Sequence, residues 1–239
     1  MELFPLTFLQ EIDLVTTNTA RLYIVATPIG NPGDITLRAL EVLQQVNIII
    51  CEEMREGTSL LKKLGIPVKE IFTLNEHNEN EKVPELIQRV LVSGETLALI
   101  SDCGTPVFSD PGSFLIQQAS DMGIPVVPVP GPSSLMAALS VLDFKPEKFI
   151  FAGFLSRVPE ERKRELMRYR SLRMPVVLMD TPYRLFALLQ DVASTFGKGH
   201  RVTVAADLTQ PREKIYRGPV SEVLQQVAER KAEFIMIIH

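Results

Sequence analysis

The chain has 239 residues, a net charge of −4, 46% hydrophobic residues and a mean hydropathy of +0.13, so it is not a disordered protein and can bury a large core. The first twenty residues hold three acidic and no basic side chains, which argues against a signal peptide. No apolar run reaches the roughly 20 residues of a membrane-spanning helix. We therefore expect a cytoplasmic protein without a membrane segment.

In the first half, apolar strand-like runs alternate with amphipathic helix-like runs. This rhythm predicts a mainly parallel sheet that is covered by helices on both faces. Asp34 is the expected N-cap of the first helix. The predicted strands are 22–26, 48–51, 70–74, 96–100 and 124–127, and the predicted helices are 35–46, 56–64, 79–92, 110–122 and 133–142.

A short polar segment that contains a proline, residues 143–148, is the expected domain boundary. It separates an N-terminal α/β domain (21–145) from a C-terminal α/β domain (146–239). Residues 1–20 are expected to form an N-terminal extension. The expected elements of the second half are strands 149–151, 176–179, 201–205 and 234–238, a basic helix within 157–173, and helices 182–195 and 220–230.

Three predicted strands end in loops rich in proline and glycine, which are residues 27–34, 101–106 and 128–134. Ligands of open α/β sheets bind at the carboxyl ends of the strands, and small residues let the backbone approach a ligand closely. Each loop alone is also compatible with an ordinary turn, in which Asp34, Asp110 and Ser133 only cap helices. The three loops together favour a binding site.

The loops contain no lysine, no G-x-G-x-x-G pattern and no G-x-x-x-x-G-K-[ST] pattern, so neither a dinucleotide fingerprint nor a P-loop is present. Instead they offer carboxylates and hydroxyls. Such groups suit a ligand that carries an amine and ribose hydroxyls but no phosphate, and a sulfonium cation fits them electrostatically. These polar residues are Thr27, Asp34, Asp102, Thr105, Asp110, Ser133 and Ser134.

Charge is divided unevenly along the chain. Residues 1–145 hold 9 basic and 18 acidic side chains, whereas residues 146–239 hold 16 basic and 11 acidic ones. The asymmetry indicates an anionic partner held by the second half. Its densest segment, 157–173, is compatible both with a solvated helix face and with a phosphate-contacting surface. Cys51 and Cys103 lie far apart and the histidines are scattered, so we expect no disulfide and no metal site.

Several of these motifs together resemble the tetrapyrrole methylase superfamily. They are T-P-I-G-N-P-G-D-I-T-L-R-A-L at residues 27–40, S-D-C-G-T-P at 101–106, S-D-P-G at 109–112 and P-V-P-G-P-S at 128–133. Within the superfamily, the chain is most similar to the small-subunit ribosomal RNA cytidine 2′-O-methyltransferases, from about Arg21 to the C-terminus. The resemblance implies two α/β domains, S-adenosylmethionine bound in the cleft between them, a homodimer, and small-subunit ribosomal RNA as the substrate.

The resemblance also implies roles for individual residues. Pro28, Gly30, Asp102, Thr105, Ser133 and Ser134 would meet the methyl donor from the first domain, and Met179, Asp180 and Leu208 from the second. For the acceptor, Glu53 and Asp207 are candidate bases and Arg55 is a candidate phosphate contact. Arg162, Lys163 and Arg164 of the basic segment are the further candidate contacts to RNA.

Three segments depart from the ribosomal RNA pattern. Residues 179–185 read M-D-T-P-Y-R-L where that group has Y-E-S-P-H-R-L, residues 206–210 read A-D-L-T-Q in place of R-E-L-T-K, and residues 52–55 read E-E-M-R in place of E-D-T-R. Two other functions therefore stay open. One is a methylase of a tetrapyrrole or another small molecule, and the other is a non-catalytic module that binds the donor or RNA.

Overall fold

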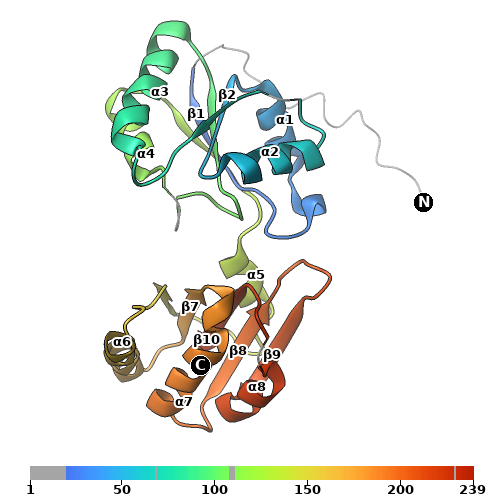
Figure 1. The fold of residues 1–239 in the computed structure, drawn as a ribbon, viewed down its shortest axis with the longest axis vertical. Helices are drawn as coiled ribbons and strands as arrows, with labels where there is room; N and C mark the ends of the chain where they lie inside the picture. Colours follow the sequence, from blue (N-terminus) through green and yellow to red (C-terminus); the bar gives the residue numbers. More distant parts are fainter. Residues whose placement is uncertain (1–19, 68, 108–110, 229) are drawn as a thin grey trace, which may run out of the picture.

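The computed structural model describes residues 20–239 except 68, 108–110 and 229, so the predicted extension lies outside the described residues apart from Ala20. The chain forms two lobes (Figure 1). The first lobe contains β1 (Leu22–Val25), η2 (Pro32–Asp34), α1 (Leu37–Gln45), β2 (Ile48–Cys51), α2 (Met54–Lys63), β3 (Glu70–Thr73), α3 (Glu79–Ser93), β4 (Leu97–Ile100), α4 (Ser113–Asp121) and β5 (Val126–Val129). The second contains α5 (Ser134–Ser140), β6 (Ile150–Gly153), α6 (Pro159–Ser171), β7 (Val176–Asp180), η3 (Pro182–Arg184), α7 (Leu185–Phe196), β8 (Arg201–Ala206), β9 (Lys214–Pro219), α8 (Val220–Val227) and β10 (Phe234–Ile238).

The first sheet is parallel throughout and has the strand order β3-β2-β4-β1-β5. Its central strands β2 and β4 are continuous apolar runs, and all their residues are buried. Such runs are typical of parallel strands with both faces covered. Helices α1 and α2 pack on one face and α3 and α4 on the other, which confirms the predicted arrangement.

The connections that follow the neighbouring strands β1 and β4 lead to opposite faces of this sheet. After β1 the chain enters α1 on one face, and after β4 it enters α4 on the other. The carboxyl ends of these two strands therefore form the topological switch point, where open α/β sheets open a crevice for ligands.

Strand β5 begins two residues later than the sequence predicts, at Val126 rather than Ile124. It includes Pro128, whose backbone has no N–H to donate. The strand tolerates this proline because it lies at the edge of the sheet and pairs only with β1. The third loop is correspondingly shorter and runs from Pro130 to Ser133.

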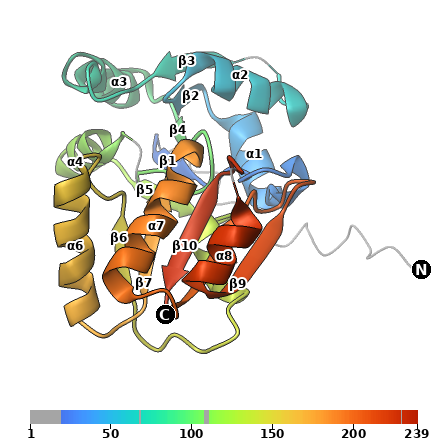
Figure 2. The same ribbon diagram turned by 60° about the horizontal axis from the view of Figure 1, so that its bottom comes forward.

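The second sheet is mixed and has the order β6-β7-β10-β8-β9, with β6 and β7 parallel and the other pairs antiparallel. Strand β9 is absent from the prediction, because Lys214–Pro219 includes Gly218 and Pro219 and has no run of apolar residues. Helices α6, α7 and α8 cover one face, with α6 and β9 at opposite ends of the sheet (Figure 2). No helix within the described ranges is long and apolar enough to cross a membrane.

Helix α5 packs with the second sheet although it precedes the predicted boundary at residues 143–148. Ala138 of α5 lies in one buried cluster with Val177, Ala205 and Ile237 of that sheet. The first sheet has both faces covered already, so the second sheet is the surface left for the apolar side of α5. The chain therefore passes between the lobes in the loop after β5, earlier than the predicted boundary of the two domains.

Candidate functional site

The three loops predicted to form a site come from the neighbouring strands β4, β1 and β5, and they are joined by hydrogen bonds. The backbone N–H of Thr27 donates to the carbonyl of Gly104 over 2.8 Å, and its hydroxyl donates to that of Ser101 over 2.9 Å. The hydroxyl of Thr105 donates to the carbonyl of Pro132 over 3.2 Å. This confirms that the three loops meet at one edge of the sheet.

Gly30 is the point at which the second lobe reaches these loops. A Cβ atom at Gly30 would lie 2.6 Å from Cγ of Gln210 and 2.9 Å from both the carbonyl of Leu208 and Oγ1 of Thr209. Real Cβ atoms do not approach other atoms so closely, so only glycine fits here. The predicted site residues Gly30 and Leu208, 178 positions apart, therefore lie in direct contact.

Asp34 does not cap α1, contrary to the prediction. The cap is Thr36, whose hydroxyl accepts the backbone N–H of Ala39 over 3.1 Å, while Asp34 ends the short helix η2. Oxygen Oδ2 of Asp34 is buried and has no hydrogen-bond partner among the described residues. A buried oxygen without a partner carries a free-energy cost, so this atom is available for a ligand.

Two cavities flank the first loop and share Ile29. One, of about 360 Å³, is lined by Asp34, Thr36, Ser133 and Thr209 among others, and therefore by residues of both lobes. The other, of about 160 Å³, is lined by the predicted donor contacts Pro28, Gly30 and Asp102 and by side chains of α2. Thr105 lies in the second loop and donates a hydrogen bond to Pro132, which lines the larger cavity. Ser134 is the first residue of α5 and follows Ser133, which caps that helix.

Glu53 and Asp102 lie at the ends of the neighbouring strands β2 and β4, close to the buried thiol of Cys51. Burial raises the pKa of Cys51 to about 11, and the negative charges of Asp102 and Glu53 add to the effect. Glu53 is exposed and precedes α2, and Arg55 is exposed in the first turn of that helix. The structure thus brings the candidate base Glu53 near the predicted donor contact Asp102.

Asp207, the other candidate base, is buried at the carboxyl end of β8 and holds the turn that follows. Its Oδ2 pairs with Arg230 over 2.7 Å, which raises the pKa of that guanidinium, and its Oδ1 accepts the backbone N–H of Glu233. The carboxylate is therefore engaged in anchoring the chain segment that carries Leu208 and Thr209 to the first loop.

The remaining predicted donor contacts lie at the carboxyl end of β7 and on the sheet face beside α5. Met179 and Leu208 pack against the cluster around Ala138. Asp180 is buried, accepts the backbone N–H of Thr181 and pairs with Arg184 over 3.2 Å. Burial raises the pKa of Asp180 above its usual range, and its Oδ2 has no partner among the described residues.

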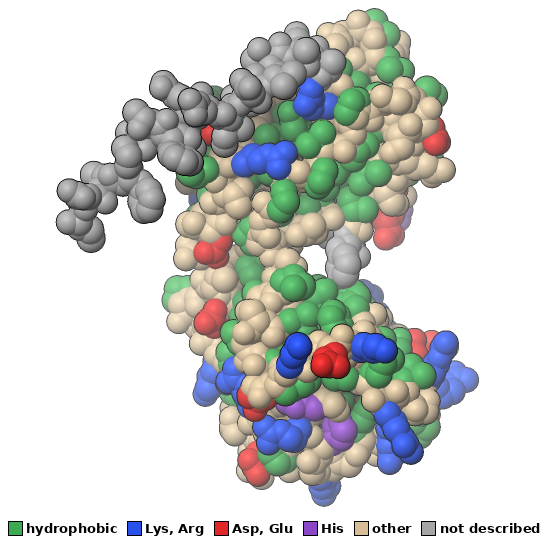
Figure 3. Space-filling view, turned by 180° about the vertical axis from the view of Figure 1, so that it is seen from behind, with side chains coloured by type: hydrophobic (Ala, Val, Ile, Leu, Met, Phe, Trp, Pro, Cys, Tyr) green, Lys and Arg blue, Asp and Glu red, His purple; other side chains and the backbone are tan. Residues whose placement is uncertain are grey.

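The basic helix α6 does not present all of its cations to solvent. Lys163 and Arg164 are exposed, whereas Arg162 is buried and pairs with Asp191 over 2.6 Å. Lys and Arg gather on the second lobe in Figure 3, whereas few lie on the first lobe in that view. The candidate phosphate surface therefore rests on Lys163, Arg164 and their exposed neighbours.

The residues present fit S-adenosylmethionine. Asp34 offers an unpaired buried oxygen, Asp102 a carboxylate, and Thr36 and Ser133 hydroxyls, and these are acceptors for an ammonium group and for ribose hydroxyls. Close backbone packing at Gly30 leaves no room for a side chain. When bound, S-adenosylmethionine supplies a methyl group activated by a sulfonium.

Known proteins are similar to this chain in sequence. Residues 21–224 match the family described as tetrapyrrole (corrin/porphyrin) methylases. A Vibrio cholerae protein named ribosomal RNA small subunit methyltransferase I is 39% identical over 91% of this chain and 76% of its own length. A protein of the same name from Leptospira biflexa is also 39% identical, over 91% of this chain and 90% of its own.

Solved structures show the same architecture. The cobalamin biosynthetic enzyme cobalt precorrin-4 methyltransferase superimposes with a TM-score of 0.67 at 20% identity, over 91% of this chain and 94% of its own. Diphthine synthase superimposes with a TM-score of 0.66 at 14% identity, over 92% and 89% of the two chains. At such identities the likeness establishes the fold. Together with the sequence matches, it shows that the chain belongs to the tetrapyrrole methylase family and is an S-adenosylmethionine-dependent methyltransferase.

Proposed function

We propose that the protein transfers a methyl group from S-adenosylmethionine to the 2′-hydroxyl of a cytidine ribose in small-subunit ribosomal RNA. The observation that carries the proposal is the contact of the lysine-free donor loops with a basic second lobe, through Gly30 and the Leu208–Gln210 segment. The relatives named ribosomal RNA small subunit methyltransferase I support the choice of substrate.

One set of residues binds the methyl donor and another binds the RNA that accepts the methyl group. Pro28, Gly30, Asp102, Thr105, Ser133 and Ser134 hold the donor from the first lobe, and Met179, Asp180 and Leu208 from the second. Transfer to a hydroxyl needs an aligned acceptor oxygen and a site that excludes water. The contact of the two lobes at Gly30 supplies one closed side of such a site.

Glu53 is the carboxylate best placed to accept the proton of the ribose hydroxyl. It is exposed, and it lies near the same strand ends as Asp102. The carboxylate of Asp207 is already paired with Arg230, so its role is to hold the turn after β8. Arg55, Lys163 and Arg164, all exposed, hold the phosphates of the RNA.

We also propose that the protein acts as a homodimer in the cytoplasm. Leu37 and Met136 leave large apolar side chains exposed at the starts of α1 and α5. Thr36, which precedes Leu37, lies against Gly131 in the loop before α5. A shared apolar surface of this kind suits a second copy of the chain. Sedimentation at several concentrations tests it, and a single monomeric species throughout would refute the dimer.

The test of function is transfer of tritium from methyl-labelled S-adenosylmethionine to purified small ribosomal subunits that lack the modification. We expect incorporation into the RNA, at a ribose. Absence of incorporation, with donor binding intact by calorimetry, would refute the RNA assignment. Labelling of a porphyrinoid instead would favour the small-molecule methylase, whose members share this fold.

A further inference from the structure

Two aromatic side chains are exposed at the same edge of the second sheet. Phe154 follows β6 and is 52% exposed, and Tyr183 lies just after β7 and is 76% exposed. Strands β6 and β7 pair in parallel, so their carboxyl ends lie side by side. Neighbouring large apolar side chains left in water are typical of a contact surface.

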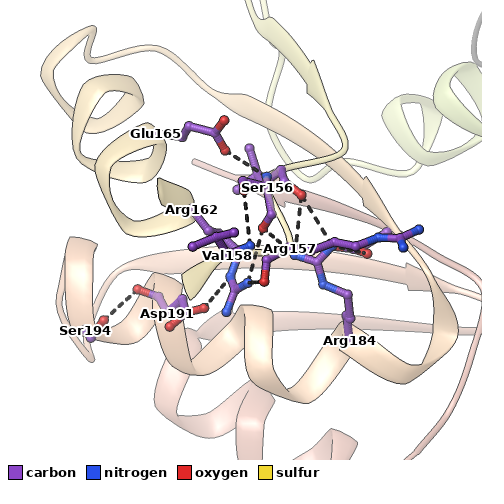
Figure 4. Close-up of polar contacts among 10 residues, drawn as sticks. Ser156, Arg157, Val158, Arg162, Glu165, Arg184, Asp191 and Ser194 are labelled. Carbon is purple, nitrogen blue, oxygen red and sulfur yellow. Dashed lines mark hydrogen bonds and ion pairs between the residues drawn. The ribbon is translucent and has the colours of Figure 1, made fainter. Parts of the chain in front are cut away.

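The loop that carries Phe154 is held by two arginines (Figure 4). Arg184 donates to the carbonyl of Leu155 over 3.3 Å and to that of Ser156 over 2.9 Å. Arg162 donates to the carbonyls of Ser156 and Arg157 over 3.2 and 3.3 Å. These bonds fix the loop before any partner arrives, which lowers the entropy cost of binding on it.

Further bonds close the same loop on its other side. The hydroxyl of Ser156 donates to Glu161 over 2.7 Å, and its backbone N–H donates to Glu165 over 3.0 Å. Asp180 and Asp191 balance the charges of the two arginines. The guanidinium groups of Arg162 and Arg184 are therefore both used to hold this loop. Contacts with a partner must then come from the exposed side chains.

Those exposed side chains combine aromatic rings with positive charge. Nζ of Lys231 lies 4.9 Å from the centre of the Tyr183 ring, and the exposed Arg157 is close to Phe154 along the chain. Rings on which bases stack, next to cations that meet phosphates, are the combination with which proteins bind single-stranded nucleic acid. A hydrophobic protein partner would not need the cations.

The position of this surface agrees with the donor site. Strands β6, β7 and β8 end at the same edge of the second sheet, and the segment after β8 touches Gly30. The second lobe touches Gly30 through the segment after β8, whereas Phe154 follows β6, the edge strand at the opposite end of the sheet from β9. Strand β6 lies beside α6 in Figure 2. The carboxyl ends of β6 and β7, after which Phe154 and Tyr183 lie, therefore share one edge of the second sheet with the turn that touches Gly30.

We propose that Phe154 and Tyr183 form a stacking surface for unpaired bases of the RNA substrate, with Arg157 and Lys231 holding the adjoining phosphates. The proposal rests on the proposed function and defines its substrate as a single-stranded segment. Sequence-independent stacking aligns the strand, so the substrate is bound without a duplex.

The test measures binding of the full-length protein to a fluorescein-labelled single-stranded RNA of twelve nucleotides and to the same sequence in a duplex. Phe154→Ala and Tyr183→Ala each weaken single-strand binding by about 5- to 100-fold. Tyr183→Phe, which keeps the ring, binds like the wild type.

The matched control is Phe149→Ala, because Phe149 is 37% exposed and precedes β6 at the opposite edge. Arg157→Ala and Lys231→Ala each reduce the slope of log RNA affinity against log salt concentration by about one, as expected when one phosphate contact is lost.

Donor affinity and the melting temperature serve as readouts that a general folding defect would move, and we expect neither to change. Affinities of Phe154→Ala and Tyr183→Ala equal to that of Phe149→Ala would overturn the stacking surface. A raised KM for small subunits with unchanged binding of free RNA would also overturn it, in favour of a ribosomal protein contact. Failure of the wild type to methylate small subunits would instead refute the proposed function, and the binding measurements do not depend on that outcome.

Discussion

The backbone N–H of Asn31 donates a hydrogen bond to the side-chain oxygen of Thr209 over 3.0 Å, joining the first donor loop to the second lobe. Thr209 has a φ of 63°, a left-handed conformation that costs energy in a β-branched residue. Asp207, two residues earlier, is also left-handed, with a φ of 49°. The turn after β8 is thus a strained segment, and its contacts with the donor loop and with Arg230 hold it in place.

The contact at Gly30 gives the first prediction. Gly30→Ala places a methyl group against the carbonyl of Leu208, which is backbone and cannot swing away. We expect a loss of about 1–3 kcal/mol in stability, together with weaker donor binding. Urea unfolding and calorimetry measure the two effects. Gly199→Ala is the control, because nothing lies within 4 Å of its added atom. Equal behaviour of both variants would contradict the account of this contact.

Asp102 gives a prediction about the donor alone. Asp102→Ala removes a carboxylate that lines the smaller cavity, and donor affinity should fall by about 1.5–3 kcal/mol if a hydrogen bond to a charged group is lost. Asp121→Ala is the control, since Asp121 is exposed and ends α4, the helix that leads away from the β4 loop. Unchanged affinity, measured by calorimetry, would remove Asp102 from the site.

The basic helix gives two opposite expectations for neighbouring arginines. Arg162→Ala leaves Asp191 without its partner and frees the loop at Ser156, so we expect a loss of about 3 kcal/mol in unfolding free energy. Arg164→Ala should change stability by less than about 0.5 kcal/mol but weaken RNA binding. Chemical unfolding and RNA titration of both variants check this, and equal stabilities would show that the buried pair is dispensable.

The buried thiol of Cys51 should make the free energy of unfolding depend on pH in the alkaline range. Burial raises the pKa of its thiol in the folded protein to about 11, above its ordinary value of 9.0, so the folded state retains the proton more strongly than the unfolded state. The stability that this difference contributes is complete below pH 9 and is lost as the pH rises toward 11. Cys51→Ala should therefore lose less stability between pH 9 and pH 10.5 than the wild type does. Parallel curves in urea unfolding would contradict the raised pKa.

The meeting of the three loops at one edge of the first sheet could be predicted from the sequence for a physical reason. Alternating apolar runs specify a parallel sheet, and loops after neighbouring strands must then meet at one edge. The strand order was not predictable from local patterns, yet it places β4, β1 and β5 side by side. Thr27 and Thr105 join the loops through bonds between residues distant in sequence.

Tertiary packing determines three features that local sequence patterns could not predict: the cap of α1, the placement of α5 and the burial of Arg162. Thr36 rather than Asp34 caps α1, because the turn η2 ends before the helix begins. Helix α5 belongs to the second sheet because of where its apolar side finds cover. The run of cations in α6 gave no sign that Arg162 turns inward to Asp191, since that contact depends on α7.

We propose that this enzyme methylates one ribose of small-subunit ribosomal RNA. The most direct test of this activity is mass spectrometry of small-subunit ribosomal RNA from a strain in which the gene is deleted and from the same strain carrying the wild type or Gly30→Ala. We predict that the deletion lacks the methyl group on one cytidine ribose, that the wild type restores it, and that Gly30→Ala restores it only in part. Full ribose methylation of the RNA in the deletion strain would contradict the account.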